Sequence, residues 1–497
     1  MIKYITKNLF LMSPLLFLLS CSISKQESGP FFGNGMKNGW ADQNSISIWT
    51  RLTKYKEANF KGIPFIEIPR KEMLKLAKNP NIDSILNTQI PPGKNIKDME
   101  GYCPGASGQV QLVYHPINDS INLIKTAWQV VDEKMDYTHQ WQLKELKAGQ
   151  IYVTKIYSRG LGQTKISDSL LGKFAIPPAR DVDSEIKFCI VSCHDYNRRD
   201  DLKNGHKIYP SMTKLNPDFY VHTGDIEYMD KPTPYALTEE LARFKWNRIF
   251  SLPFQRTFYN NHTSYFMKDD HDVGFDDSYP GKNYGMINFE RGLEIFDKEQ
   301  FPTAEKTYKT VRWGKDFQIW IVEGRNYRSK NIIPDGAEKT IWGKEQKDWF
   351  YQTVNASDAT FKLLITSSPI LGPDRLKKND NLSNKNYTYE REEILSFIKK
   401  QNNFFIANGD RHWQYVTHIE GTNLWEFGTG AGSDAHAGGW SQKDYRPEHK
   451  FLRVKGGFLS GIVKQVDGVP AVQFIHHDVD GKVVNRMSFK VKLDRKF

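Results

Sequence analysis

The chain has 497 residues, of which 39% are hydrophobic and 13% aromatic. This composition can build packed cores, so it excludes wholesale disorder, and the length leaves room for two or three domains. The formal net charge of +11 would attract anionic substrates or surfaces, although a solvated lysine surface accounts for it at least as well.

Residues 1–21 have the features of a targeting segment. Lys3 and Lys7 supply a positive start, and the apolar run that follows is too short for a membrane-spanning helix, which needs about 20 residues. Leu18-Leu19-Ser20-Cys21 resembles a bacterial lipobox, which implies cleavage before Cys21 and lipid attachment to its sulfur. The alternative is an ordinary secretory signal with an incidental cysteine. Residues 22–35 are polar and glycine-rich, as a tether should be.

Residues 36–180 read as β-structure. Polar and apolar residues alternate over 45–52, 109–114 and 151–157, with turn residues between these runs. This pattern predicts an antiparallel β-sandwich of about 140 residues. No catalytic cluster stands out here, and the proline-containing segment 170–184 is the expected connector to the next domain.

From residue 185 to 497, strands alternate with helices. Residues 317–322 and 361–366 read as strands, and residues 239–250 and 340–354 as amphipathic helices. Four apolar runs end in side chains that can bind metals. The ligands of open α/β sheets bind at the carboxyl ends of the strands, so these loops are expected to converge. They carry Cys193, Asp225, Tyr228, Asp270, His271, Asp410 and His412.

The spacing of two cysteines after the lipobox indicates which of them could bind a metal. Cys189 and Cys193 stand four apart on one predicted strand, roughly 13 Å if extended, which is too far for a disulfide. Cys189 is therefore expected in the core. Cys193, where the strand ends, is the better candidate for a metal thiolate.

A thiolate, a phenolate and several carboxylates together supply much negative charge, which suits a trivalent ion such as Fe(III). Asp225 could bridge to a second, oxygen-liganded ion such as calcium. Two such ions can clamp a phosphoryl group and generate hydroxide, with His271 free to protonate the leaving oxygen. Taken singly, each motif has a structural alternative: a Gly-Asp turn, a solvated acidic loop over 269–272, or a packed His412.

Four motifs together resemble the alkaline phosphatase D (PhoD) family of metallophosphoesterases: Ser192-Cys193, Thr223-Gly224-Asp225-Ile226-Glu227-Tyr228, Asp269-Asp270-His271-Asp272 and Gly409-Asp410-Arg411-His412. The resemblance implies that Cys193, Asp225, Tyr228 and His412 hold Fe(III). It also implies that Asp225 bridges and that Asp270 and Asp410 complete a cage with Ca(II), one or two ions, or another divalent metal. His271 matches the catalytic histidine of the wider superfamily.

Asp276 and Arg411 are two further candidate site residues. Asp276 stands where the family usually has Asn, and its carboxylate remains a metal-ligand candidate. Arg411, between two presumed ligands, could bind a phosphate oxygen, or it could form a surface salt bridge.

The expected fold is an N-terminal antiparallel β-sandwich (36–180) followed by a four-layer α/β/β/α metallophosphoesterase domain (185–497). The expected function is hydrolysis of phosphate monoesters or diesters by a metal-bound hydroxide. We expect a monomer, lipid-anchored in the bacterial cell envelope, with the outer membrane preferred because no Asp follows Cys21, and without a specific nucleic-acid partner. Two alternatives stay open: hydrolysis of a sulfate ester or phospholipid headgroup, and a non-catalytic surface-binding lipoprotein.

Overall fold

The computed structural model describes residues 29–304 and 306–491. The predicted signal segment and Cys21 lie outside these ranges. Of the tether expected over 22–35, the described part, 29–35, is instead packed into the protein, with Phe31 and Phe32 buried. No helix within the two described ranges is long and apolar enough to cross a membrane.

The largest sheet in the described chain has nine strands, in the order β23-β22-β21-β9-β10-β11-β1-β2-β6. Its centre is parallel: β9 pairs with β10 and β10 with β11. These three strands are almost wholly buried because both faces of the sheet are covered. The strands are β9 (Ile186–Val191), β10 (Phe219–His222), β11 (Thr263–Phe266), β1 (Met36–Gly39), β2 (Ile46–Arg51), β6 (Thr138–Leu143), β21 (Phe458–Val466), β22 (Val469–His477) and β23 (Val483–Lys490).

A second sheet, of seven strands in the described residues, packs face to face on the first. One apolar cluster contains Ile190 and Val221 from the nine-stranded sheet together with Ile319 and Leu363 from the seven-stranded sheet. The strands, in sheet order, are β14 (Lys309–Trp313), β15 (Phe317–Ile321), β16 (Phe361–Thr366), β17 (Phe404–Asn408), β19 (Trp425–Thr429), β18 (Gln414–His418) and β20 (His449–Arg453).

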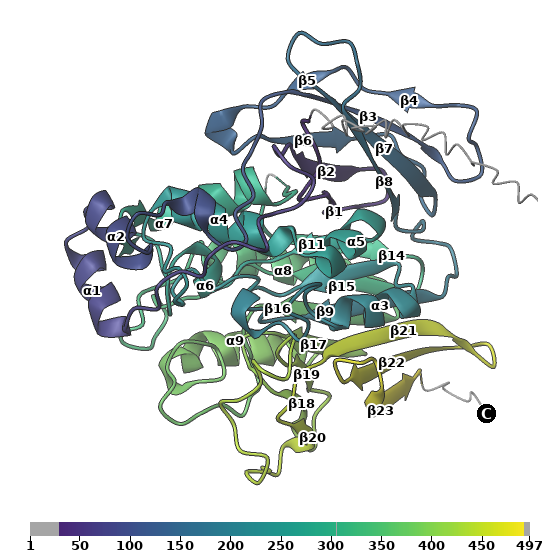
Figure 1. Ribbon diagram of the computed structural model, residues 1–497. Coiled ribbons are helices and arrows are strands. Elements are labelled where there is room, and N and C mark those ends of the chain that lie inside the picture. Colours follow the sequence, from purple (N-terminus) through teal and green to yellow (C-terminus); the bar gives the residue numbers. More distant parts are fainter. Residues whose placement is uncertain (1–28, 305, 492–497) are drawn as a thin grey trace, which may run out of the picture.

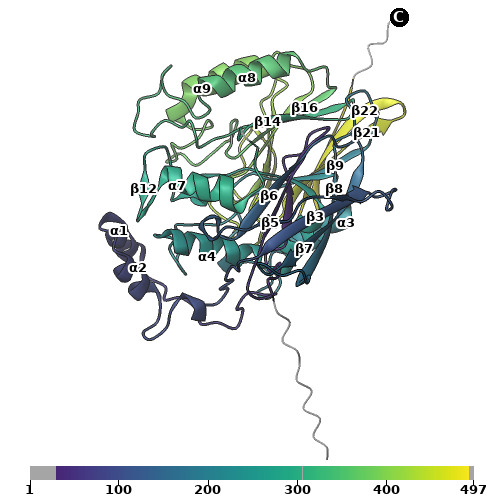
Figure 2. The same cartoon turned by 90° about the horizontal axis from the view of Figure 1, so that it is seen from above.

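Helices cover the two outer faces (Figures 1 and 2). Tyr220 of β10 packs in one cluster with Tyr209 of α3 (Ile208–Leu215) and Phe258 of α5 (Pro253–Asn261). On the other face, Leu364 of β16 packs in a second cluster with Phe350 of α8 (Lys344–Asn355) and Ile394 of α9 (Thr388–Ile398). The first face also carries α4 (Glu239–Phe250), α6 (Asp270–Val273) and α7 (Phe289–Glu294).

The N-terminal region differs from the sequence prediction in its connections. A separate antiparallel sheet contains β3 (Gln109–Pro116), β4 (Ile124–Lys125), β5 (Gln129–Val130), β7 (Ile151–Arg159) and β8 (Asp168–Ala175). Its apolar face packs on Ile48 of β2 and Trp141 of β6. Strands β1, β2 and β6, however, belong to the nine-stranded sheet, since β1 pairs with β11. Part of the predicted N-terminal domain is therefore continuous with the second domain.

The prediction of β-structure throughout residues 36–180 is wrong for one stretch. Residues 70–89 form two helices, α1 (Arg70–Lys78) and α2 (Ile82–Gln89), whose Met73, Leu76 and Ile85 pack into the cluster under α4. Elsewhere the predicted strands 45–52, 109–114, 151–157, 317–322 and 361–366 correspond to β2, β3, β7, β15 and β16, and the predicted helices to α4 and α8.

Candidate metal centre

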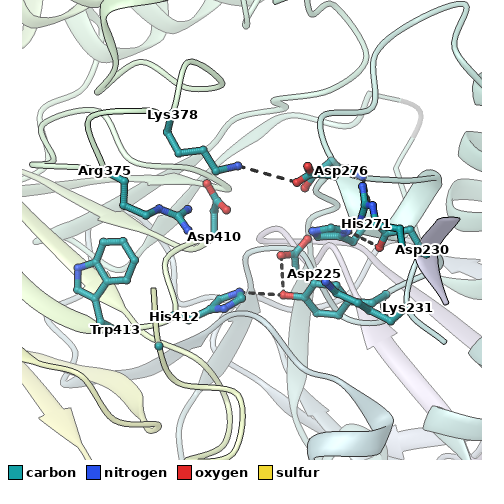
Figure 3. Close-up of a pocket in the computed structure, with 14 residues that line it drawn as sticks. Asp225, Asp230, Lys231, His271, Asp276, Arg375, Lys378, Asp410, His412 and Trp413 are labelled. Atoms are coloured by element: carbon teal, nitrogen blue, oxygen red, sulfur yellow. Dashed lines mark hydrogen bonds and ion pairs between the residues drawn. The ribbon is translucent and has the colours of Figure 1, made fainter. Parts of the chain in front are cut away.

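The predicted ligands meet at one edge of the molecule, beyond the carboxyl ends of β9, β10, β11 and β17 (Figure 3). Three of them have left-handed backbone conformations: Cys193 (φ 52°), Asp225 (φ 54°) and Asp410 (φ 63°). Positive φ is uncommon for residues other than glycine, and such strain is concentrated at functional sites. Three of the four strands, β9, β10 and β17, thus end in a sharp turn that carries a donor side chain.

Asp272, on the short helix α6, fixes two of these loops. Its Oδ2 accepts hydrogen bonds from the backbone N–H groups of Asp225 (2.7 Å) and Asp269 (2.8 Å). Its Oδ1 accepts from Ile226 (2.8 Å) and Glu227 (3.2 Å). Burial raises the pKa of Asp272 to about 7. One carboxylate therefore holds the β10 and β11 loops together.

One side of the site is built from sulfur, phenol and imidazole. Tyr228 donates its hydroxyl to Asp225 Oδ2 (2.9 Å) and lies 3.0 Å from His412 Nε2. Cys193 Sγ is 3.6 Å from the same carboxylate oxygen. Donor atoms of Cys193, Asp225 and His412 all lie within 4.8 Å of one another.

Burial controls the protonation of the Cys193, Tyr228 and His412 side chains. It raises the pKa of the Cys193 thiol and of the Tyr228 phenol well above their ordinary values, and Asp225 adds to both shifts. It lowers the pKa of His412 to about 3, so that imidazole is neutral and can act as a ligand. The thiol and phenol would ionise only with a cation beside them.

The other side of the site is made of carboxylates. Asp225 belongs to three of the four donor groups found in the described residues: one with Cys193 and His412, one with Asp270 and His271, and one with Asp269 and Asp410. Its Oδ1 is buried and has no hydrogen-bond partner among those residues. Burial raises the pKa of Asp225, and Asp270 and Asp269 add to the effect. Buried carboxylates in this number call for a cation.

Asp276 lies at the mouth of the site, with its side chain 47% exposed. Together with Asp270 and Asp277 it forms the fourth donor group. Its carboxylate Oδ1 is 3.9 Å from the Lys378 ammonium, and its backbone N–H donates to Asp230 (3.2 Å). An aspartate at this position is therefore compatible with an oxygen-liganded ion.

His271 lies on the wall of the pocket and is paired with Asp230, whose Oδ1 is 2.7 Å from its Nδ1. Burial alone would lower the pKa of His271, but Asp230, Asp270 and Asp225 outweigh it and raise that pKa well above its ordinary value. The imidazole is therefore protonated at neutral pH in the absence of a metal. The sequence prediction did not include Asp230.

The prediction that Arg411 contacts a phosphate is corrected by the structure. Its side chain is only 1% exposed and does not line the pocket. The guanidinium instead pairs with Asp374, with Asp410 (2.6 Å) and with Asp380 (3.6 Å). The salt bridge of the alternative interpretation is therefore present, but it is buried and not at the surface.

Arg375 and Lys378 line the pocket, which Arg411 does not. Both line a pocket of about 210 Å³ together with Trp413. His436 was also missed: its ring centroid is 4.9 Å from that of Tyr228, and its buried Nε2 has no partner in the described chain. These residues come from irregular loops, where no periodic pattern indicates them. Asp269 and Asp277 could have been found, because each is adjacent to a predicted ligand.

Cys189 and Cys193 form no disulfide, as expected from their spacing. Cys103, Cys189 and Cys193 are free and buried within the described residues, and Cys189 lies in the core.

Comparisons with known proteins were made by sequence and by fold. A family model described as PhoD-like phosphatase matches residues 296–456, which include Asp410 and His412. Alkaline phosphatase D from Bacillus subtilis (strain 168) is 24% identical over 293 residues, covering 48% of this chain and 48% of that protein. The match thus spans about half the length of this relative.

Two solved structures share the fold. One, described as the structure of PhoD, has a TM-score of 0.67 and 15% identity and covers 93% of this chain and 90% of its own. The purple acid phosphatase PPD1 from yellow lupin (Lupinus luteus) seeds has a TM-score of 0.60 and 12% identity, covering 92% of this chain and 74% of its own. The resemblance that the motifs indicated is confirmed: residues 296–456 match the PhoD-like phosphatase model, and the fold is shared with the structure described as PhoD.

Proposed function

We propose that this protein is a phosphoric ester hydrolase that cleaves phosphate monoesters, diesters or both at a centre of two metal ions. The observation that carries the proposal is the position of Asp225, which is shared by the sulfur and nitrogen donors on one side and the carboxylates on the other. The similarity to PhoD-like phosphatases supports the same activity.

The residues present fit such a centre. Buried donors converge, Asp225 Oδ1 lacks a partner among the described residues, and the donor set divides by chemistry. Cys193, Tyr228 and His412, with Asp225, would hold Fe(III). Asp270, Asp410 and Asp276, with Asp225 as the bridge, would hold Ca(II) or another divalent ion. When bound, the ions would supply an activated water and neutralise phosphate charge.

The chain's own residues then supply position and protons. Arg375 and Lys378 line the pocket and would attract the phosphate oxygens. Asp230 holds His271 by Nδ1, which leaves Nε2 as the nitrogen that donates a proton to the leaving oxygen as the ester P–O bond breaks. His271 ends the step neutral, still hydrogen-bonded to Asp230.

The finer architecture is part of the proposal. The two facing sheets with helices outside them support a four-layer α/β/β/α catalytic unit, and the packing of β3, β7 and β8 on β2 and β6 supports a sandwich-like N-terminal unit that shares strands with it. An envelope location with a lipid on Cys21 rests on the lipobox-like residues 18–21 alone.

Asp225→Ala tests the proposal. The variant should lose both metal ions and at least about a thousandfold in kcat on bis(4-nitrophenyl) phosphate, because metal activation of the attacking water is lost. Elemental analysis of protein purified without chelators gives the metal content. Asp83→Ala, at an exposed site on α2, is the matched control. Undiminished turnover by Asp225→Ala would refute the proposal, and zinc or manganese in place of iron would refute the Fe(III) assignment.

A further inference from the structure

Within the described chain, four arginine and lysine side chains line the pocket above the metal ligands: Arg70, Lys231, Arg375 and Lys378. They divide into two pairs by the charges that surround them. This difference indicates that the pairs bind different parts of a substrate.

Arg375 and Lys378 are already partly neutralised. Lys378 Nζ lies 3.0 Å from Asp380 Oδ2 and 3.9 Å from Asp276 Oδ1. Arg375 Nε lies 3.6 Å from Asp374 Oδ1. In Figure 3 both side chains lie on the side of the pocket occupied by Asp410 and Trp413. This pair is therefore suited to the phosphate held at the metal ligands.

Arg70 and Lys231 are compensated less. Neither side chain forms an ion pair or a hydrogen bond with any residue in 29–304 or 306–491, although Lys231 Nζ lies 5.7 Å from the centroid of the Tyr228 ring and its charge helps to lower the pKa of Asp230. Lys231 follows Asp230 directly in the sequence, and Figure 3 shows it on the His271 side of the pocket, across from Arg375 and Trp413. Arg70 lies near the same side, since its charge and that of Asp230 both act on the pKa of the Tyr235 and Tyr284 phenols. Two cations without an ion pair in the described chain favour an anionic ligand there.

The position of Arg70 is fixed by the fold. It is the first residue of α1, and Met73 and Leu76 of that helix are buried in the main cluster. The buried Gln89, at the end of α2, accepts a hydrogen bond from the backbone N–H of Tyr235 (2.7 Å) and donates one to its carbonyl (3.2 Å). The helical pair is thereby attached to the segment that follows Lys231.

We propose that Arg70 and Lys231 form a subsite for a second anionic group on the leaving-group side of the substrate. The side follows from His271, which donates its proton to the leaving oxygen, so this part of the inference rests on the proposed function. The substrate class is a phosphate ester whose alcohol carries another phosphate or a carboxylate. Helices α1 and α2 therefore contribute to specificity although they precede the catalytic loops by more than a hundred residues.

The test compares binding of ligands with one and with two anionic groups to metal-loaded protein by isothermal titration calorimetry. Propylphosphonate is the single anion, and propane-1,3-bisphosphonate and hexane-1,6-bisphosphonate are the double anions. The wild type should bind one of the bisphosphonates about tenfold more tightly than propylphosphonate, as expected for one additional charge-assisted contact. Arg70→Ala and Lys231→Ala should each reduce that ratio severalfold, Arg70→Glu should abolish it, and Arg70→Lys should restore part of it.

Lys71→Ala, one residue further along α1 and exposed, is the matched control and should keep the full ratio. Chelation of metal by the bisphosphonates would affect all variants alike. Equal binding of both ligand types by the wild type, or an equal loss for both in Arg70→Ala, would overturn the subsite. Because binding is measured without turnover, a protein that binds bisphosphonates through Arg70 but cleaves no ester would contradict the proposed function and retain the anion subsite.

Discussion

In the proposed function, His271 donates a proton and Asp230 orients it. The metal ligands alone supply neither role. The Nδ1–Oδ1 distance of 2.7 Å fixes the orientation of the imidazole, which faces the pocket. Asp230 is in turn held by the backbone N–H of Asp276. In the proposed function, Asp230 is therefore a positioning residue that acts through His271.

Asp230→Asn should lower kcat about a hundredfold or more on alkyl phosphate esters, which need a proton on the departing oxygen, because general acid catalysis contributes on the order of a hundredfold to ten-thousandfold. Esters of 4-nitrophenol, a good leaving group, should lose far less, and KM should change little for both. Steady-state kinetics on the two substrate types measures the difference. An equal loss on both would show that Asp230 has only a structural role.

Arg411→Ala should destabilise the protein rather than weaken substrate binding. Removing this buried guanidinium takes the ion pair from Asp410 and leaves Asp374 and Asp380 with only Arg375 and Lys378, at a cost of about 3 to 5 kcal/mol. Urea unfolding of metal-free protein measures this loss. Arg375→Ala, whose side chain is 38% exposed, should instead raise KM with little change in stability. The reverse pattern would restore the role first predicted for Arg411.

The candidate site shows which residues a sequence can identify. Cys193, Asp225, Asp270, Asp410 and His412 were predictable because each follows an apolar strand, and strand ends meet at one edge of a sheet. The direction in which the Arg411 side chain points was not predictable, since it depends on the left-handed turn at Asp410. Arg375, Lys378 and His436 come from loops that leave no periodic signal.

At the scale of elements, the short helix α6 organises the site. Asp272→Asn would place an amide N–H₂ group against backbone N–H donors that now share a carboxylate oxygen. At least one buried donor would lose its acceptor, at a cost of about 1 to 3 kcal/mol. The variant should therefore lose this much unfolding free energy without metal and bind the metals more weakly. Urea unfolding and elemental analysis measure the two effects, and an unchanged metal affinity would contradict the assigned role.

Strands were predicted more reliably than the helices of the N-terminal region. The alternation over 109–114 and 151–157 reflects strands with one face on the core, and β3 and β7 have this burial pattern. Helices α1 and α2 bury few residues each, because one narrow apolar stripe packs on α4 while the rest is exposed. So few buried positions give only a weak helical periodicity of apolar residues, and the two helices were therefore not predicted.

At the scale of the whole molecule, buried neutral histidines make stability depend on pH. Burial lowers the pKa of His262 to about 4 and of His206 and His476 to about 3. The unfolded chain binds protons at these residues below about pH 6.5, whereas the folded protein does not, so unfolding free energy falls with falling pH. The three together should remove up to about 4 kcal/mol per pH unit between about pH 6 and 4.

Urea unfolding of metal-free protein at pH 7.5 and pH 5 checks this expectation. His476→Gln removes one of the titrating groups, so its loss of stability between the two pH values should be about 2 kcal/mol smaller than that of the wild type. An equal loss of stability in the variant and the wild type would contradict it.

The division into domains could be predicted only in part. The change from alternating strands to alternating strands and helices near residue 185 is real, but hydrogen bonds between distant segments are invisible to local patterns. Strand β1 pairs with β11 through Asn38 and Thr263. Nothing in residues 36–39 indicates that partner.

The pairing of β1 with β11 fixes the order in which the strands of the nine-stranded sheet can assemble. Strand β1 is made first and its partner β11 more than two hundred residues later, while the hairpin of β21 and β22 that flanks β9 is made near the end. Both sides of the parallel centre formed by β9, β10 and β11 thus wait for distant parts of the chain, and closing such long loops is slow. A nascent chain that contains β9 but stops before residue 458 would leave the free edge of β9 unpaired, so productive folding of the sheet follows synthesis through β21 and β22.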